Sequence, residues 1–245
     1  LYQFDRDIRH IYLKYLLKVE NTFKSVLAHE FSALYGHDNY LKLENFDAVP
    51  DNFSAIIKLF GDIQQETARQ MSKHHQAVTH YLSEYGYIPL WVLVNVLTFG
   101  KVTMFYKLMK PQDKQNIARK FHVDAKELHK YMSLCGLARN QCAHDERFFD
   151  LKFRWHLHTR SIANFSCLGL ERDKSGSYPS GTNDVYAIGI VFARLLGTAD
   201  TAEFIASMSA AFSKLEQQLH TISIKDVMCI MGYPAAWERL QQLAR

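Results

Sequence analysis

Four polar residues near the middle of the chain have the types needed for acid–base and phosphate chemistry. The stretch LARNQCAHDERFF, residues 137–149, contains Arg139, Asn140, His144 and Arg147. An imidazole exchanges a proton near neutral pH, and a guanidinium binds phosphate oxygens through two parallel hydrogen bonds. The stretch therefore has two interpretations. It is either the solvated face of a helix or a site that acts on a phosphodiester such as RNA.

The helical pattern around this stretch separates a core face from a polar face. A helix is predicted to begin after Asp124, a good N-cap residue. At 100° per residue, one face carries Leu128, Tyr131, Cys135, Ala138, Cys142 and Phe149. Asn140, His144 and Arg147 fall on the opposite side, with Arg139 on its flank. Leu137 and Leu151 lie beside this polar cluster, which indicates that another surface covers them; a second copy of the same helix is the simplest one.

An Arg followed by a His after four residues is a weak motif by itself. The chain has 12 His among 245 residues, so chance pairs at such spacings are expected. Arg69 precedes His74 and His75 at similar spacings in RQMSKHH, which is a competing pair of the same kind. Only the context of each pair can distinguish them.

Composition sets broad limits on the class of protein. Hydrophobic residues make up 48% of the chain and the formal net charge is +4, which favours a folded protein and permits an anionic partner. Four scattered cysteines without a CxxC pair are interpreted as reduced, mostly buried thiols in a cytoplasmic protein, and no carboxylate cluster suggests a metal site. The first residue is Leu1 rather than methionine, which leaves open what precedes it. The apolar stretch at 87–106 is too short and interrupted for a membrane span and is predicted to be a buried helix.

The periodicity predicts an all-α fold. Apolar residues recur at three- and four-residue spacings, without convincing period-two alternation, and predict helices at 4–34, 52–84 (one or two, with a break at Gly61), 89–108, 112–121, from 124 onward, 184–197, 200–220, 223–231 and 235–244. The polar stretch 171–184 is predicted to be a loop. We expect a helical core over residues 1–160 and a C-terminal helical extension over 161–245.

Four blocks resemble the abortive-infection (Abi) family of phage-defence proteins, a branch of the HEPN superfamily. These are FDRDIRHIYLKYLLKVENTFKS at 4–25, HYLSEYGYIPLWVLVNVLTFGKVTMFYKLM at 80–109, LARNQCAHDERFFD at 137–150 and IKDVMCIMGYPAAWERL at 224–240. Ribonucleases of the HEPN class carry an Arg, four to six residues and then a His, often with Asn after the Arg. One position departs from the pattern, because Asn95 stands where the family often has Glu.

The resemblance implies a HEPN-like helical bundle and a metal-independent endoribonuclease that acts as a toxin or phage-defence effector. It implies Arg139, Asn140 and His144 as catalytic residues, Arg147 as a substrate-binding residue, and neither a metal nor a cofactor. The expected partners are RNA, a second copy bound through the motif helix, and an antitoxin RNA or protein; no membrane is expected.

Two alternatives stay open at this point. The chain could keep the fold and bind RNA without cleaving it, and Asn95 favours that reading. Arg147 could form an ion pair with Asp150 instead of binding substrate.

Overall fold

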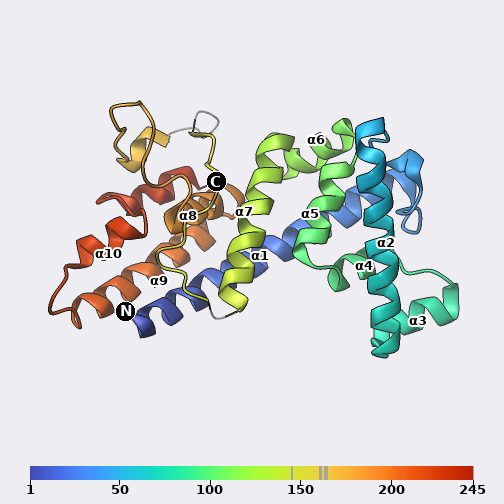
Figure 1. Ribbon diagram of the computed structural model, residues 1–245, viewed down its shortest axis with the longest axis horizontal. Helices are drawn as coiled ribbons and strands as arrows, with labels where there is room; N and C mark the ends of the chain where they lie inside the picture. The colour runs from blue at the N-terminus through green and yellow to red at the C-terminus, as the bar shows by residue number, and fades with distance from the viewer. Residues whose placement is uncertain (145, 160–161, 163–164, 245) are drawn as a thin grey trace. The chain divides into compact units, whose positions relative to one another are not determined.

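The computed structural model describes residues 1–144, 146–159, 162 and 165–244, and in these residues the protein is all-α (Figure 1). The only β pairing in this part of the chain consists of two isolated bridges, Phe46 with Met109 and Lys152 with Asp184. The predicted all-α class is therefore confirmed. No helix among these residues has the length and apolar character that a bilayer crossing requires.

The chain forms two compact units, and one of them is made of two segments that are separated in the sequence. One unit comprises residues 20–133, and the other comprises residues 1–19 together with 134–245. Two long helices, α1 (Tyr2–Tyr35) and α7 (Ala125–Ala143), contribute residues to both units. The predicted boundary near residue 160 remains a prediction.

The unit of residues 20–133 is built around aromatic side chains. Between α1 and α7 it contains η1 (Leu43–Asn45), α2 (Pro50–Ser72), α3 (Gln76–Tyr85), α4 (Leu90–Val96), α5 (Phe99–Leu108) and α6 (Pro111–Lys120). Phe105 of α5 packs edge-on against Phe31 of α1 and against Phe46, each with ring centroids 5.1 Å apart. Figure 1 shows α5 beside α2, with the second half of α1 passing behind them. Glu20 is buried and forms an ion pair of 2.7 Å with buried Lys24, which gives it a structural role.

Two helix boundaries in this unit differ from the sequence prediction. The break within 52–84 falls at residues 73–75, because α2 continues through Gly61 and His75 caps α3 by accepting from Val78 N. The predicted helix 89–108 is two helices. Leu97 is extended, and the Thr98 hydroxyl accepts a hydrogen bond from Lys101 N, which starts α5 anew.

The unit of residues 1–19 and 134–245 surrounds one buried helix. Its elements after α7 are η3 (Phe165–Leu168), α8 (Val185–Leu195), α9 (Thr198–Glu216), α10 (Ile224–Ile230) and η4 (Trp237–Leu243). Every residue from Val185 to Arg194 is buried. The predicted loop at 171–184 contains no helix, as expected, while the predicted α-helix at 235–244 forms 3-10 geometry instead.

The first half of α1 lies antiparallel to α9 in this unit. Three ion pairs connect the two helices in reverse order, Asp7 with Lys214, Lys14 with Glu203 and Lys18 with Asp200. Beneath them the buried Tyr12 hydroxyl lies 2.5 Å from that of Tyr233 and donates to the Val185 carbonyl. These contacts fix the N-terminal segment against the C-terminal helices.

Candidate functional site

The motif lies where α7 ends. Arg139 and Asn140 lie near its C-terminal end, and His144 follows Ala143, the final helical residue. The backbone N–H of His144 still donates to the Asn140 carbonyl at 3.0 Å, so His144 continues the helical path by one residue. The helical wheel predicted from the sequence included Arg147 and Phe149, but both residues lie beyond the end of α7, and Arg147 belongs to the following loop.

The burial of the side chains agrees with the predicted core and polar faces of α7. The residues assigned to the core face are all buried: Leu128, Tyr131, Cys135, Ala138, Cys142 and Phe149. Asn140 and His144 are exposed, and Arg139 is half-buried with an interaction of its own. Leu137 is 49% exposed beside them, while Leu151 is half-buried in the loop. Substituting the exposed polar residues therefore removes no core packing.

A buried ion pair on α1 holds the loop that follows the motif. The Asp5 carboxylate accepts hydrogen bonds from the backbone N–H groups of Phe148, at 3.0 Å, and Phe149, at 2.7 Å. Its other oxygen lies 3.2 Å from Arg9 Nε, and both side chains are almost fully buried. These bonds hold the loop that follows the motif against the first half of α1.

The sequence pattern does not identify Asp5 and Arg9 as residues that support the motif loop. The available signal was a pair of opposite charges at i and i+4 next to the apolar residues Phe4, Ile8 and Tyr12. A pair with this spacing is normally an exposed ion pair on a helix surface. Only its burial in the structure shows that it supports the motif loop.

Arg147 has the local partner that the structural alternative predicted. Its guanidinium forms an ion pair with Asp150 and lies over the Phe149 ring, 5.0 Å from the centroid. Its backbone carbonyl accepts a hydrogen bond from the Gln141 side chain. Arg147 also lines an open cavity of about 480 Å³ with Leu1, Tyr2, Asp5, Arg9 and Phe149. A phosphate would have to compete with Asp150 for this guanidinium.

The cysteine beside the motif is not suited to nucleophilic chemistry. Burial raises the pKa of the Cys142 thiol to about 12, against a smaller opposing effect of the Arg9 charge. The thiol is therefore protonated at neutral pH, whereas a nucleophilic cysteine must ionise. Cys135 is buried too, but Cys167 is half-buried and Cys229 is exposed, so the prediction of mostly buried thiols holds for two of the four.

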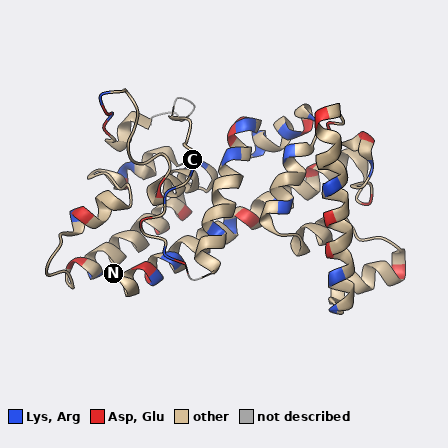
Figure 2. Cartoon of the chain, in the orientation of Figure 1, with Lys and Arg blue, Asp and Glu red and all other residues tan. Residues whose placement is uncertain are grey.

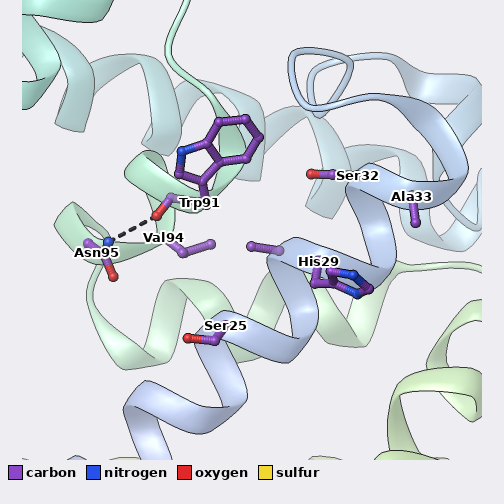
Figure 3. Close-up of a pocket in the computed structure, with 8 residues that line it drawn as sticks. Ser25, His29, Ser32, Ala33, Trp91, Val94 and Asn95 are labelled. Atoms are coloured by element: carbon purple, nitrogen blue, oxygen red, sulfur yellow. Dashed lines mark hydrogen bonds between the residues drawn. The ribbon is translucent and has the colours of Figure 1, made fainter.

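Asn95, the position that departs from the family pattern, belongs to the other unit. Its side-chain amide donates to the Trp91 carbonyl at 2.9 Å within α4. Figure 3 shows Trp91, Val94 and Asn95 of α4 facing Ser25, His29 and Ser32 of α1 across a cavity of about 430 Å³. In this structure Asn95 is an exposed residue of that cavity wall.

The competing pair around Arg69 is occupied by local contacts. Arg69 forms an ion pair of 2.5 Å with Glu66 on its own helix, and His75 serves as the N-cap of α3. These contacts support a structural interpretation of RQMSKHH. Within the described ranges, His, Cys, Asp and Glu side chains form no group of three or more with the spacing of a metal site.

Comparison with known proteins gives a family match over the part of the chain that contains the motif. A family model described as Abi-like protein matches residues 1–150. That match covers more than half of the 245 residues and includes Arg139 through Arg147. No curated protein and no solved structure shows significant similarity to the chain.

Proposed function

Because this chain belongs to the Abi-like protein family, we propose that it is a metal-independent endoribonuclease of the HEPN type that acts as a toxin or effector in abortive infection against phage. One observation carries the proposal: Arg139, Asn140 and His144 lie at the C-terminal end of α7, off its core face and inside the matched segment, and Asn140 and His144 are exposed. The residue types are those that RNA cleavage without a metal requires.

The proposed reaction uses the RNA's own 2′-hydroxyl. The 2′-oxygen forms a bond to the adjacent phosphorus while its proton passes to a base, and the bond from phosphorus to the 5′-oxygen breaks as that oxygen gains a proton. The products are a 2′,3′-cyclic phosphate and a 5′-hydroxyl. His144 exchanges the proton, Arg139 neutralises charge on the non-bridging oxygens, and Asn140 hydrogen-bonds the phosphate or orients the imidazole.

Arg147 has a secondary role in this proposal. Its guanidinium is exposed, so a phosphate can exchange with Asp150 as its partner. Because surface ion pairs contribute only about 0–1 kcal/mol, that exchange carries a small energetic cost. Arg147 then adds positive charge for the substrate without entering the chemical step.

A homodimer through α7 would complete the site. Arg139 and His144 differ by about 140° around the helix axis, so one copy is poorly arranged to hold a phosphate from both sides. Leu137, Asn140 and His144 lie within about 60° of one another by the same geometry, and the exposed leucine gives this face an apolar contact. A two-fold contact uses one patch twice and brings two Arg and two His together.

The chemistry is tested by incubating purified protein with total RNA in EDTA. We expect cleavage by the wild type and loss of cleavage in Arg139→Ala and His144→Ala, with the helical circular dichroism spectrum and a cooperative melting transition retained. Arg119→Ala and His10→Ala remove exposed residues of the same types elsewhere and should stay active. Cleavage that depends on added Mg²⁺, or products with 5′-phosphates, would contradict the mechanism.

The dimer is tested by sedimentation with Leu137→Glu, which should shift the protein to monomer and reduce cleavage together. Mixing Arg139→Ala with His144→Ala chains should restore part of the activity if one composite site needs one residue of each type. A monomeric wild type that is fully active at nanomolar concentration would refute the shared site.

The second candidate is an RNA-binding protein without turnover, and Asn95 is the feature that favours it. RNA bound with equal affinity by the wild type and His144→Ala, without cleavage by either, would establish it. In both cases we propose action in the cytoplasm and restraint by an antitoxin RNA or protein.

A further inference from the structure

A basic basin is formed by side chains of α5, α6 and α7 within the unit of residues 20–133. The basin has a volume of about 260 Å³ and is lined by Lys107, Lys114, Ala125, Lys126, His129 and Lys130. Figure 2 shows the blue of Lys and Arg on α6 and on the first half of α7. Three separate helices thus bring four lysines and a histidine around one concave surface.

These lysines lack the carboxylate partners that usually accompany such a cluster. Among the residues that the structure describes, none of the four lysines forms an ion pair. Lys114 Nζ donates instead to the Lys107 carbonyl at 3.0 Å. Four like charges so close together repel one another, and a bound anion would remove that repulsion.

Two members of the cluster are partly removed from solvent. Burial lowers the pKa of the half-buried Lys114, with the Lys107 charge adding to the effect and Asp47 opposing it. Burial also lowers the pKa of His129, and the charges of Lys107 and Lys114 lower it further. His129 is therefore the group in the basin whose protonation will report a nearby negative charge.

We propose that this basin binds backbone phosphates of the RNA strand, as a docking site separate from the residues that cleave it. Lysine ammonium groups are compact point charges that suit phosphate oxygens without reading sequence. The basin's lining contains no ring to stack on a base other than the His129 imidazole, so the phosphate is the recognised group. The choice of RNA as the bound polyanion rests on the proposed function.

The helix α7 connects the basin to that function in the sequence. Lys126, His129 and Lys130 lie in its first two turns, and Arg139 and Asn140 lie near its C-terminal end. The basin residues are therefore distinct from the reactive groups. We therefore expect the basin to govern affinity and its salt dependence, and not the chemical step.

The test compares RNA binding in a His144→Ala background, in which cleavage does not consume the probe. Lys107→Gln/Lys126→Gln removes two exposed basin charges. The matched control, Lys58→Gln/Lys73→Gln, removes two exposed lysines elsewhere in the same unit, neither of which forms an ion pair in the described residues. Fluorescence anisotropy with a single-stranded RNA oligonucleotide is recorded between 50 mM and 1 M salt.

The expected result follows from counterion release. Two lost phosphate contacts should reduce the slope of log affinity against log salt by about 1.4, which is about 25-fold in affinity at 0.1 M relative to 1 M salt. The control should change affinity by less than about 3-fold. Binding of RNA should also raise the pKa of His129, followed by NMR, and this shift should shrink in the basin variant.

Three results would overturn the inference. One is an equal loss in the basin variant and the control, and another is absence of RNA binding by the parent protein. The third is a basin-dependent affinity for a nucleoside triphosphate or inorganic phosphate with unchanged RNA affinity, which would assign the basin to a small phosphate ligand. Basin-dependent RNA binding by a wild type that never cleaves RNA would refute the ribonuclease and leave the docking site standing.

Discussion

Replacing Asp5 by alanine should be among the most damaging single changes near the motif. The Asp5 carboxylate accepts two backbone hydrogen bonds from Phe148 and Phe149 and pairs with Arg9. Its removal leaves a buried guanidinium without this partner and two buried N–H groups without these acceptors. The loop that follows His144 then loses its attachment to α1.

The loss of folding free energy in Asp5→Ala follows from these contacts. Breaking a buried ion pair by removing one partner costs about 3–5 kcal/mol. An unsatisfied buried N–H group costs about 1–3 kcal/mol, but costs at one site are not additive. We therefore expect the free energy of unfolding to fall by about 4–6 kcal/mol, or the melting temperature by about 8–24 °C at 2–4 °C per kcal/mol.

The assay is urea and thermal denaturation of Asp5→Ala beside Asp7→Ala. Asp7 lies on the same helix and pairs with Lys214 at 2.8 Å, but this pair is exposed and should contribute at most about 1 kcal/mol. The combined Asp5→Leu/Arg9→Met variant should be less destabilised than Asp5→Ala, because no charge is left buried. An Asp5→Ala variant as stable as Asp7→Ala would show that the buried contacts of Asp5 do not stabilise the fold as argued.

Three further changes test other parts of the structure. Gly232→Ala should lower the free energy of unfolding by about 2–5 kcal/mol, measured in urea, because φ is +84° and the new Cβ would lie 2.0 Å from the buried Asp184 carboxylate. The pKa of the Cys142 thiol is about 12 in the folded protein and near 9 in the unfolded chain. Keeping this buried thiol protonated therefore favours the folded state fully below pH 9, and this stabilisation is lost as the pH rises toward 12. Unfolding at pH 8 and pH 11 should therefore show a smaller alkaline loss in Cys142→Ala than in the wild type. Arg147→Ala should change stability by less than about 1 kcal/mol, because its ion pair with Asp150 is exposed, and should weaken RNA binding several-fold without abolishing cleavage; complete loss of cleavage would assign Arg147 a chemical role.

The helical class and the two faces of the motif helix follow from the amino-acid pattern alone. Apolar side chains at three- and four-residue spacings can be buried together only on a helix, so the pattern predicted both the helices and the burial of Cys135 and Ala138. The same period placed Asn140 and His144 on the exposed side. These features follow from local geometry, which any sequence of this pattern shares.

Local pattern was insufficient at two helix ends. The helical spacing of apolar residues continues past Leu97, and only the extended backbone there and the Thr98 cap divide α4 from α5. Similarly, the predicted core face continues to Phe149, although α7 ends at Ala143. The backbone N–H groups of Phe148 and Phe149 donate instead to Asp5, more than 140 residues away in the chain. The periodicity of apolar residues does not show whether a backbone N–H group bonds to a local or to a distant acceptor.

Long-range packing, in contrast, determines which charged residues lie together. Lys107, Lys114 and Lys126 lie on three helices and are separated by seven or more residues, so no spacing in the sequence groups them into one basin. Asp5 and Arg9 have the spacing of an ordinary surface pair, and their burial alone gives them a structural role. Burial depends on which surfaces pack against a side chain, and those surfaces come from parts of the chain that no local pattern relates to one another.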